Sequence, residues 1–254
     1  MTHAFGIDIG GSGIKGGLVD LKVGQLIGER CRLPTPQPAT PKAVAKVVAK
    51  VIDHFGADTA GLPIGLTVPA IVTHGYTRSA ANIDKKWIDA PVFEIFSTVL
   101  GRPVSVLNDA DAAGLAEVHY GSARGNNGLV IVTTLGTGIG SALIYRGVLV
   151  PNAELGHIQI DGFEAEKRAA ASVRTKEDLS WADFGKRLQE FYATVEFLFS
   201  PDLFVVGGGV SRNSDKFLPL LDLKTPIVPA ALRNHAGIVG AAWAAAQAPV
   251  DPDR

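Results

Sequence analysis

Cysteine is almost absent from this sequence, and its scarcity excludes two kinds of small-protein architecture. The chain has a single cysteine, Cys31. One thiol cannot form a disulfide within the chain, and cysteine-based zinc sites need several thiolates. Disulfide-stapled scaffolds and cysteine zinc sites are therefore excluded, and we expect Cys31 to be a small apolar filler of the core.

An excess of charge of one sign is missing as well. Lys and Arg number 24 and Asp and Glu 25, which gives a formal net charge of −1. General nucleic-acid and membrane-surface binders normally show a basic excess, so we expect neither kind of partner. Any polyanion must then meet a local basic patch, for which the candidates are Lys15, Lys85, Lys86 and Arg124.

Long apolar runs are also missing. No run approaches the roughly 18 residues that a membrane helix needs. The first residues, Met1 to Phe5, lack the basic and apolar segments of a secretory signal. We therefore expect a cytoplasmic protein that makes no contact with membranes.

The chain does hold enough apolar residues for a large core. Its 254 residues are 46% hydrophobic and only 19% charged, which excludes a disordered chain. This length suits one large domain or two small lobes. The 29 glycines gather in short loops, so a fibrous protein is excluded too.

The hydrophobic pattern predicts two similar halves. Strands over 4–9, 14–20 and 24–33 are joined by turns too short for crossover helices, which indicates an antiparallel meander and excludes a single Rossmann unit. The first half continues with helix 42–55, strand 62–68, helix 92–100, strand 104–107 and helix 110–119. The second half is predicted as strands 128–135 and 139–150, a polar stretch over 161–180, helix 181–198, strand 203–206 and a last helix 236–247.

A glycine-rich loop follows the first predicted strand. Glycines let backbone N–H groups approach an anion without obstruction by side chains, and a lysine and a serine add further donors. Because the spacing is not that of a P-loop, a plain glycine hairpin remains the alternative. The candidate phosphate-binding residues are Asp8, Gly10, Gly11, Ser12, Gly13 and Lys15.

Two further glycine turns lie in the second half. One opens the second meander, at the same place as the first loop, and a phosphate chain held between two lobes needs one cradle from each. The other follows strand 203–206, where glycines let a nucleotide base or ribose lie against the backbone, with a tight packing turn as the alternative. The residues concerned are Gly136, Thr137, Gly138, Gly208 and Gly209.

Asn108 and Asp109 stand where a predicted strand meets a helix. At this place Asp109 can act as a general base that takes the proton of an attacking hydroxyl, with Asn108 orienting that hydroxyl. The alternative is that Asp109 caps the following helix. Asp111 lies inside the first helical turn, where a carboxylate favours the helix dipole.

Glu154 and His157 are three residues apart with a glycine between them, so both can point at one small ligand. This suits recognition of sugar hydroxyls, whereas a metal pair is disfavoured because no third ligand follows at helical spacing. The polar loop 79–87 adds Asn82, which can hydrogen-bond a hydroxyl. A merely solvated loop is the alternative.

In this order the motifs resemble those of the ROK-type sugar kinases of the actin-like ATPase superfamily and, within that family, the bacterial polyphosphate glucokinases. The resemblance covers residues 4–247. It implies an α/β, two-lobe actin-like ATPase (ribonuclease H-like) fold, in which each lobe is a mixed sheet flanked by helices, with a cleft between them. The expected lobes are 1–107, joined by helix 236–247, and 108–235, with 248–254 as a tail.

The resemblance also implies an activity: phosphoryl transfer from inorganic polyphosphate, ATP or both to the 6-hydroxyl of glucose, with mannose as a possible second acceptor. Asp109 would be the catalytic base, and Mg²⁺ would be positioned by Asp8, through water. A homodimer is expected. The sugar-binding residues that the resemblance implies are Asn82, Asn108, Glu154, His157 and Glu166, with Asp161 as the rival of Glu166.

One stretch departs from the family pattern. Ordinary ROK members carry several cysteines soon after Glu-x-Gly-His, but residues 162–178 have none, so we expect no zinc. The departure leaves the choice between Glu166 and Asp161 open. An ATP-only hexokinase, a kinase of another sugar and a sugar-sensing member without catalysis remain the alternatives.

Overall fold

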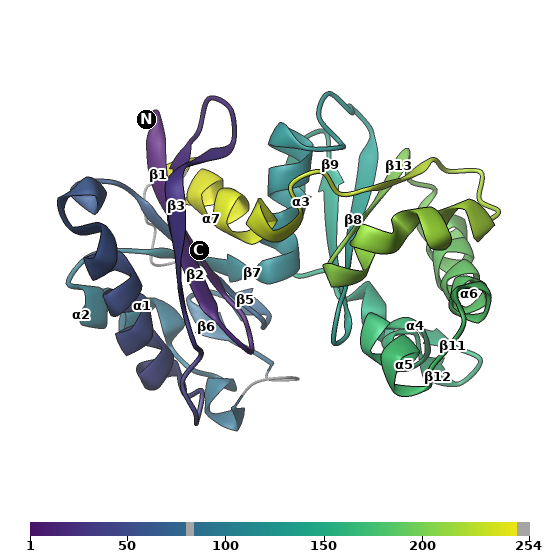
Figure 1. Ribbon diagram of the computed structural model, residues 1–254, viewed down its shortest axis with the longest axis horizontal. Helices are drawn as coiled ribbons and strands as arrows, with labels where there is room; N and C mark the ends of the chain where they lie inside the picture. Colours follow the sequence, from purple (N-terminus) through teal and green to yellow (C-terminus); the bar gives the residue numbers. More distant parts are fainter. Residues whose placement is uncertain (80–83, 248–254) are drawn as a thin grey trace. The chain divides into compact units, whose positions relative to one another are not determined.

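The structure is a computed structural model that describes residues 1–79 and 84–247. It divides into two compact units, one formed by Met1–Ala112 with the segment from His235 onward, the other by Ala113–Asn234 (Figure 1). The division therefore falls after residue 112, whereas the sequence-based boundary was placed after residue 107. Among the described residues, no helix is both long enough and apolar enough to cross a membrane.

The first unit is built on a five-stranded mixed sheet. Its strand order is β3-β2-β1-β4-β7, and the predicted meander at its start is confirmed because β1 pairs antiparallel with β2, and β2 with β3. The pairs β1–β4 and β4–β7 are parallel. The strands are β1 (His3–Ile9), β2 (Ile14–Asp20), β3 (Gln25–Leu33), β4 (Ile64–Val68) and β7 (Ser105–Asn108).

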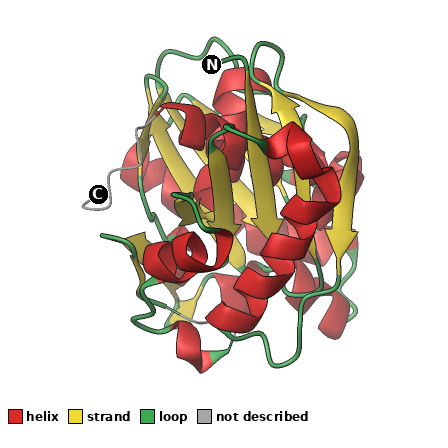
Figure 2. Ribbon diagram, turned by 90° about the vertical axis from the view of Figure 1, so that its left-hand side faces the viewer, coloured by secondary structure: helices red, strands yellow, loops and turns green. Residues whose placement is uncertain are grey.

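Helices cover both faces of this sheet. On β1, Phe5 meets Phe55 edge-to-face, while a Cβ added at the next residue, Gly6, would overlap the carbonyl oxygen of Ile238. Since successive strand residues face opposite sides, these contacts place the first helix and the last helix on opposite faces. The helices are α1 (Pro41–Phe55), α2 (Val92–Leu100) and α7 (Ala236–Gln247). Figure 2 views the unit from the side of α1 and α2, with helices in front of the strands.

Short elements complete the first unit. Thr40 caps α1 by accepting a hydrogen bond from the Ala43 amide, and Pro41 suits the first helical turn. The short elements are the hairpin β5 (Val72–Thr73) and β6 (Tyr76–Thr77) and the 3₁₀ helices η1 (Gly56–Thr59) and η2 (Lys85–Trp87).

The second unit repeats the sheet order of the first. Its order is β10-β9-β8-β13-β14, with an antiparallel meander followed by parallel pairs. The single strand predicted over 139–150 is wrong, because Arg146 and Gly147 have φ of 53° and 78° and form a tight hairpin turn. The strands are β8 (Leu129–Leu135), β9 (Ile139–Tyr145), β10 (Val148–Val150), β13 (Leu203–Gly207) and β14 (Ile227–Pro229).

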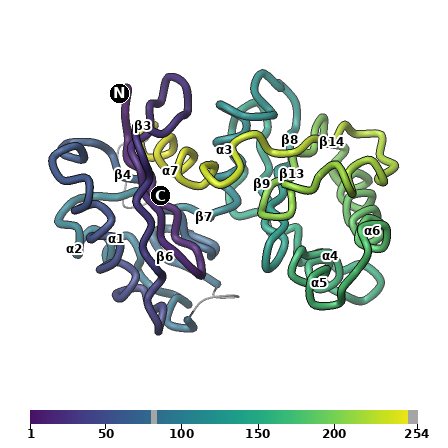
Figure 3. Tube along the Cα trace, viewed as in Figure 1, coloured from purple at the N-terminus to yellow at the C-terminus, as the bar shows by residue number. Residues whose placement is uncertain are grey.

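The polar stretch 161–180 contains short elements that periodicity could not reveal. They pack against the hydrophobic core of the second unit, to which the long helix 181–199 also contributes. The hydroxyl of Ser180 caps this helix by accepting a hydrogen bond from the Asp183 amide. The helices are α3 (Asp109–Tyr120), α4 (Glu166–Ala169), α5 (Ala171–Lys176) and α6 (Trp181–Phe199). The remaining pieces are β11 (Gln159–Ile160), β12 (Phe163–Glu164), η3 (Leu155–His157), η4 (Gly209–Lys216), η5 (Leu218–Leu220) and η6 (Arg233–His235). In Figure 3 the chain can be followed from β13 through β14 to α7, which belongs to the first unit.

Candidate functional site

The first glycine loop links β1 to β2 and is closed by a hydrogen bond from the Gly10 amide to the Gly13 carbonyl, 3.1 Å long. Asp8 and Lys15 are partners in the strand register, and their charged groups lie 3.0 Å apart. The hydroxyl of Thr67 donates to the other oxygen of Asp8 at 3.2 Å. Gly11 and Ser12, at the tip, are exposed. The loop therefore offers an accessible backbone beside a fixed ion pair.

Further basic residues lie near this loop, and they were not among the predicted site residues. Arg32 donates to the carbonyl of Ser12 at 3.3 Å. Burial lowers the pKa of His235, and the positive charges of Arg30 and Lys15 lower it further, so these groups lie near one another. The predicted meander could have indicated Arg32, because the pairing of β2 with β3 places Arg32 opposite Lys15.

Asn108 and Asp109 form the junction of β7 and α3. The Asn108 side chain accepts hydrogen bonds from the amides of Ala110 (2.8 Å) and Asp111 (3.2 Å) and donates to the carbonyl of Ala70. The capping role considered for Asp109 thus belongs to Asn108, which fixes the helix start. Asp109 accepts from the Ala110 amide at 2.9 Å and is only half-buried. Its carboxylate lies in the first turn of α3, at the positive end of the helix dipole.

The second glycine loop, between β8 and β9, has different neighbours. The amide of Ser172 donates to the Gly136 carbonyl at 3.0 Å, and its hydroxyl donates to the Thr137 carbonyl at 2.6 Å. A Cβ added at Gly138 would overlap the carboxylate of Glu166, which accepts a hydrogen bond from the Ile139 amide at 3.2 Å. This loop is therefore tied to α5 and lies against a carboxylate.

Glu154, His157 and Glu166 are brought together in the second unit. Burial raises the pKa of Glu154, the charge of His157 lowers it, and the charge of Glu166 raises it again. The rival residue Asp161 has a side chain that is 79% exposed, in the turn between β11 and β12, and its carboxylate lies 3.9 Å from Arg168. The geometry favours Glu166 over Asp161 as the third member of this group.

Glu164 also belongs to this group and was not anticipated. Its carboxylate lies 3.5 Å from His157 Nδ1 and 2.9 Å from Lys167 Nζ. The ligand atoms of His157, Glu164 and Glu166 all lie within 4.8 Å of one another. The third candidate ligand, Glu164, comes from the β11–β12 hairpin and not from a residue at helical spacing, so the sequence pattern did not reveal it. The absence of zinc stays a prediction.

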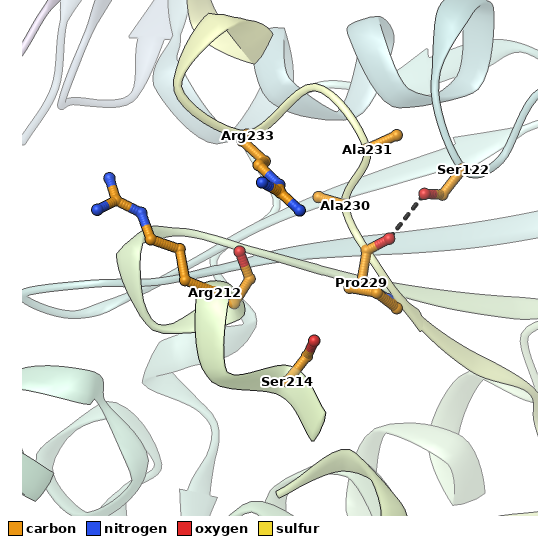
Figure 4. Close-up of a pocket in the computed structure, with 8 residues that line it drawn as sticks. Ser122, Arg212, Ser214, Pro229, Ala230, Ala231 and Arg233 are labelled. Atoms are coloured by element: carbon orange, nitrogen blue, oxygen red, sulfur yellow. Dashed lines mark hydrogen bonds between the residues drawn. The ribbon is translucent and has the colours of Figure 1, made fainter. Parts of the chain in front are cut away.

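The third glycine turn follows β13. Gly208 has φ of 82°, and a Cβ there would overlap the carbonyl oxygen of Leu135, so the turn packs tightly against the end of β8. Gly209 has open space beside it. Beyond this turn lies a cavity of about 450 Å³, whose arginines were not among the predicted residues (Figure 4). Asn82 lies outside the described residues.

Comparisons with known proteins agree on one family. The model of the ROK family matches residues 4–172. The polyphosphate glucokinase of Mycobacterium tuberculosis strain H37Rv is 55% identical, over 95% of this chain and 91% of that protein. The polyphosphate glucokinase of Mycobacterium leprae is 53% identical, over 95% of this chain and 74% of that protein.

Solved structures agree with this result. The crystal structure of an inorganic polyphosphate/ATP-glucomannokinase from Arthrobacter sp. strain KM has a TM-score of 0.93 and 56% identity, over 97% of this chain and 99% of that one. A ROK family glucokinase from Streptomyces griseus, solved with glucose and AMPPNP, has a TM-score of 0.82 and 24% identity. The match covers 97% of this chain and 100% of that one. The predicted fold class, two mixed sheets flanked by helices as in ROK sugar kinases, is confirmed.

Proposed function

The chain belongs to the ROK family, and we propose that it transfers a phosphoryl group from inorganic polyphosphate or ATP to the 6-hydroxyl of glucose. The observation that carries this proposal is the 55% identity to polyphosphate glucokinases over 95% of the chain. The side chains support it, since a carboxylate at a helix start, a glycine loop with a lysine, and a carboxylate–histidine group are what such a reaction requires.

In this proposal Asp109 is the general base. The hydroxyl oxygen of glucose attacks the terminal phosphorus of the donor, and the bond from that phosphorus to the bridging oxygen breaks. The hydroxyl proton passes to the carboxylate of Asp109, and the negative charge leaves on the shortened donor. Asn108 acts through the helix start that it caps, which holds Asp109 in one orientation.

Glu154, His157 and Glu166 would bind hydroxyls of the sugar that do not react. Two carboxylates accept hydrogen bonds from hydroxyls, and the imidazole donates or accepts according to its protonation. Asn82 is proposed as a further partner on the strength of the motif alone. Because the Arthrobacter protein is named a glucomannokinase, we propose mannose as a second acceptor.

Each unit offers a glycine loop that suits the donor, and in the first unit Lys15 adds a positive charge. Backbone amides at Gly11 to Gly13, with Ser12, suit its phosphate oxygens, as Gly136 to Gly138 do in the second unit, with Gly208 and Gly209 beside them. The Asp8 carboxylate is already paired with Lys15 and Thr67, and carboxylate oxygens accept several hydrogen bonds. It therefore suits a contact to Mg²⁺ through water. The ion would neutralise charge on the donor.

The test is the formation of glucose 6-phosphate by the purified protein, measured separately with ATP and with polyphosphate in the presence of Mg²⁺. Turnover with polyphosphate supports the proposal. Turnover with ATP alone favours an ATP-dependent hexokinase, and glucose binding without turnover favours a sugar sensor. Size-exclusion chromatography with light scattering tests the proposed homodimer, and elemental analysis tests the absence of stoichiometric zinc.

A further inference from the structure

Glu164 lies beside His157 and has no part in the reaction proposed above. One oxygen of its carboxylate is 3.5 Å from His157 Nδ1. We propose that Glu164 is a positioning residue, which keeps a proton on Nδ1 of His157 and so leaves Nε2 to accept a hydrogen bond from a hydroxyl of the sugar. The proposal rests on the proposed function, because it takes His157 as a sugar-binding residue.

The backbone brings Glu164 back to His157 over a short path. His157 is the last residue of η3, and the β11–β12 hairpin follows almost at once. At the tip of this hairpin, residues 161 and 162 have φ of 51° and 80°, as in a tight two-residue turn. The amide of Ala165 donates to the carbonyl of Ile158 at 2.8 Å and closes the hairpin next to His157. The positions from which both side chains extend are therefore fixed by backbone contacts.

The carboxylate of Glu164 is held at both of its oxygens. Oε1 faces His157 Nδ1, while Oε2 lies 2.9 Å from Lys167 Nζ. Lys167 is three residues further along the chain, in the short helix α4. Because each oxygen has its own partner, the lysine limits the rotation of the carboxylate and keeps one oxygen directed at the imidazole.

This pairing decides which ring nitrogen of His157 carries the proton. An ionised carboxylate only accepts hydrogen bonds, so the nitrogen that faces it has to donate. In a neutral imidazole one nitrogen is a donor and the other an acceptor, and the hydrogen bond made by one sets the state of the other. The proton is then on Nδ1, and Nε2 has a lone pair.

The arrangement sets what the site asks of its ligand. Nε2 of His157 adds one more acceptor to the carboxylate oxygens of Glu154 and Glu166, the other proposed sugar-binding groups. Acceptors bind groups that donate a proton, which a sugar hydroxyl does and a fluorine or a methyl ether does not. Without Glu164, the ring could carry its proton on Nε2, and this acceptor would be lost.

A metal ion is the alternative partner of these side chains. The ligand atoms of His157, Glu164 and Glu166 lie within 4.8 Å of one another. The ammonium of Lys167 already contacts one oxygen of Glu164, however, and its positive charge opposes a cation there. An Nδ1 that donates to a carboxylate has no lone pair left for a metal. Binding of a metal is therefore an outcome that the test has to exclude.

The first test reads the proton on His157 directly by NMR of the full-length protein labelled with ¹⁵N-histidine. The chain has six histidines, and the signals of His157 are assigned by their loss in His157→Ala. Spectra are recorded near pH 8.5, roughly two pH units above the ordinary pKa of histidine. The ¹⁵N shifts of the ring show which nitrogen is protonated. We expect Nδ1 in the wild type and a loss of this preference in Glu164→Gln, whose amide can donate to Nδ1.

The second test measures the affinity for glucose by calorimetry, with and without EDTA. The control is Glu177→Gln, which also removes a carboxylate paired with a cation in the second unit, since Glu177 lies 2.7 Å from Arg187. We expect Glu164→Gln to weaken binding by roughly 3- to 10-fold and the control by no more than about 2-fold. Glu164→Asp keeps an acceptor and should recover part of the loss. Circular dichroism and Tm establish that each variant is folded.

A double-mutant cycle separates positioning from direct contact. If Glu164 acts only through His157, Glu164→Gln should add less than about 2-fold to the loss caused by His157→Ala. The kcat at saturating glucose should stay within about 2-fold of wild type in Glu164→Gln, because the hydroxyl bound by His157 does not react. Steady-state kinetics with polyphosphate and with ATP measure this second value.

Several results would overturn the proposal. A proton on Nε2 in the wild type would remove its basis, and an undiminished effect of Glu164→Gln in the His157→Ala background would give Glu164 a contact of its own. A change of glucose affinity on adding EDTA would make the group a metal site, and an equal loss in Glu177→Gln would indicate a general effect of charge. If the wild type neither bound nor phosphorylated glucose, the proposed function would fail instead, and the NMR spectrum would still decide whether Glu164 positions His157.

Discussion

In the first unit the glycine loop lies among cations, whereas in the second unit the matching loop lies against a carboxylate. Lys15 and Arg32 flank the first loop, and Glu166 accepts a hydrogen bond at the end of the second. The two sheets nevertheless have the same strand order. The shared architecture therefore fixes where each loop lies, and a few side chains on neighbouring elements set the charge beside it.

The helices packed on the two sheets differ in a similar way. In the first unit, glycines on the strands let the backbone of α7 lie directly on the sheet, so that a Cβ at Gly65 would overlap the carbonyl oxygen of Ala241. In the second unit the glycine is on the helix, and a Cβ at Gly114 would lie 2.6 Å from the Ala142 Cβ and 2.8 Å from Ile144 Cδ1. The overlap at Gly65 is deeper, 1.9 Å from a backbone oxygen, whereas at Gly114 the Ile144 side chain can turn away and only the Ala142 Cβ is fixed, so the first contact tolerates less.

The largest expected effect is that of Asp109→Asn on turnover. The amide keeps the shape of the side chain but cannot accept the proton, so kcat should fall by roughly 10² to 10⁴. The affinity for glucose should change little, because the isosteric amide leaves Glu154, His157 and Glu166 unchanged. Steady-state kinetics and glucose binding by calorimetry check both statements. Near-normal turnover would exclude Asp109 as the base, and Asp53→Asn on the exposed face of α1 serves as the control.

Gly65→Ala and Gly114→Ala sharpen the comparison of helix packing. We expect Gly65→Ala to lower the free energy of unfolding by about 3 kcal/mol or more, because the new methyl group meets a carbonyl oxygen of α7. Gly114→Ala should cost about 1 kcal/mol, since overlap with side chains is partly offset by a better helix propensity. Urea unfolding measures both. Equal losses would contradict the distinction between backbone and side-chain contacts.

His157→Ala and Glu154→Gln should act mainly on the sugar. Each removes one partner of a polar contact, at a cost of roughly 1–3 kcal/mol, which is about 5- to 150-fold in the affinity for glucose. The kcat at saturating glucose should fall much less than in Asp109→Asn. Measuring KM for glucose and for each donor separately checks this. A loss confined to the donor would move these residues out of the sugar site.

The smallest expected effect concerns stability and pH. Because burial raises the pKa of Glu154 above its ordinary value in the folded protein, its ionisation costs stability as the pH rises through that pKa. Glutamine cannot ionise, so Glu154→Gln should raise Tm at pH 7 by about 1–2 °C relative to wild type. The difference should vanish near pH 3, well below the ordinary pKa of glutamate, where the folded and the unfolded wild type both bind the proton. Calorimetric scans at the two pH values measure it, and a gain that is equal at both would contradict this cause.

Much of the fold followed from periodicity, and the rest depended on geometry that no pattern displays. The long elements, such as 41–55 and 181–199, carry a clear apolar stripe and were predicted within a residue or two. The turn at Arg146 and Gly147 divides an apolar run without a turn dipeptide of the usual kind. Helices α4 and α5 are too short to show a period.

The site was predictable where a residue ends an element and unpredictable where separate segments meet. Asp8, Asp109 and Glu154 each adjoin the end or the start of an element, and their sequence neighbours were informative. Glu164 reaches His157 only through a two-residue hairpin. Arg212 and Arg233 line one cavity because β13 and β14 are neighbours in the sheet. Arg212 follows β13 and Arg233 follows β14, so their proximity depends on the strand order.

The close seat of α7 on β1 and β4 also has a consequence for synthesis on the ribosome. β1 is made before the second unit and α7 after it, so the first unit cannot complete its packing until residues 236–247 have left the exit tunnel. The second unit is one continuous segment, 113–234, and can fold while its neighbour still waits for a helix. Nascent chains arrested before residue 236 should therefore resist protease over the second unit and remain open over β1 and β4, which reverses the usual order in which amino-terminal parts fold first.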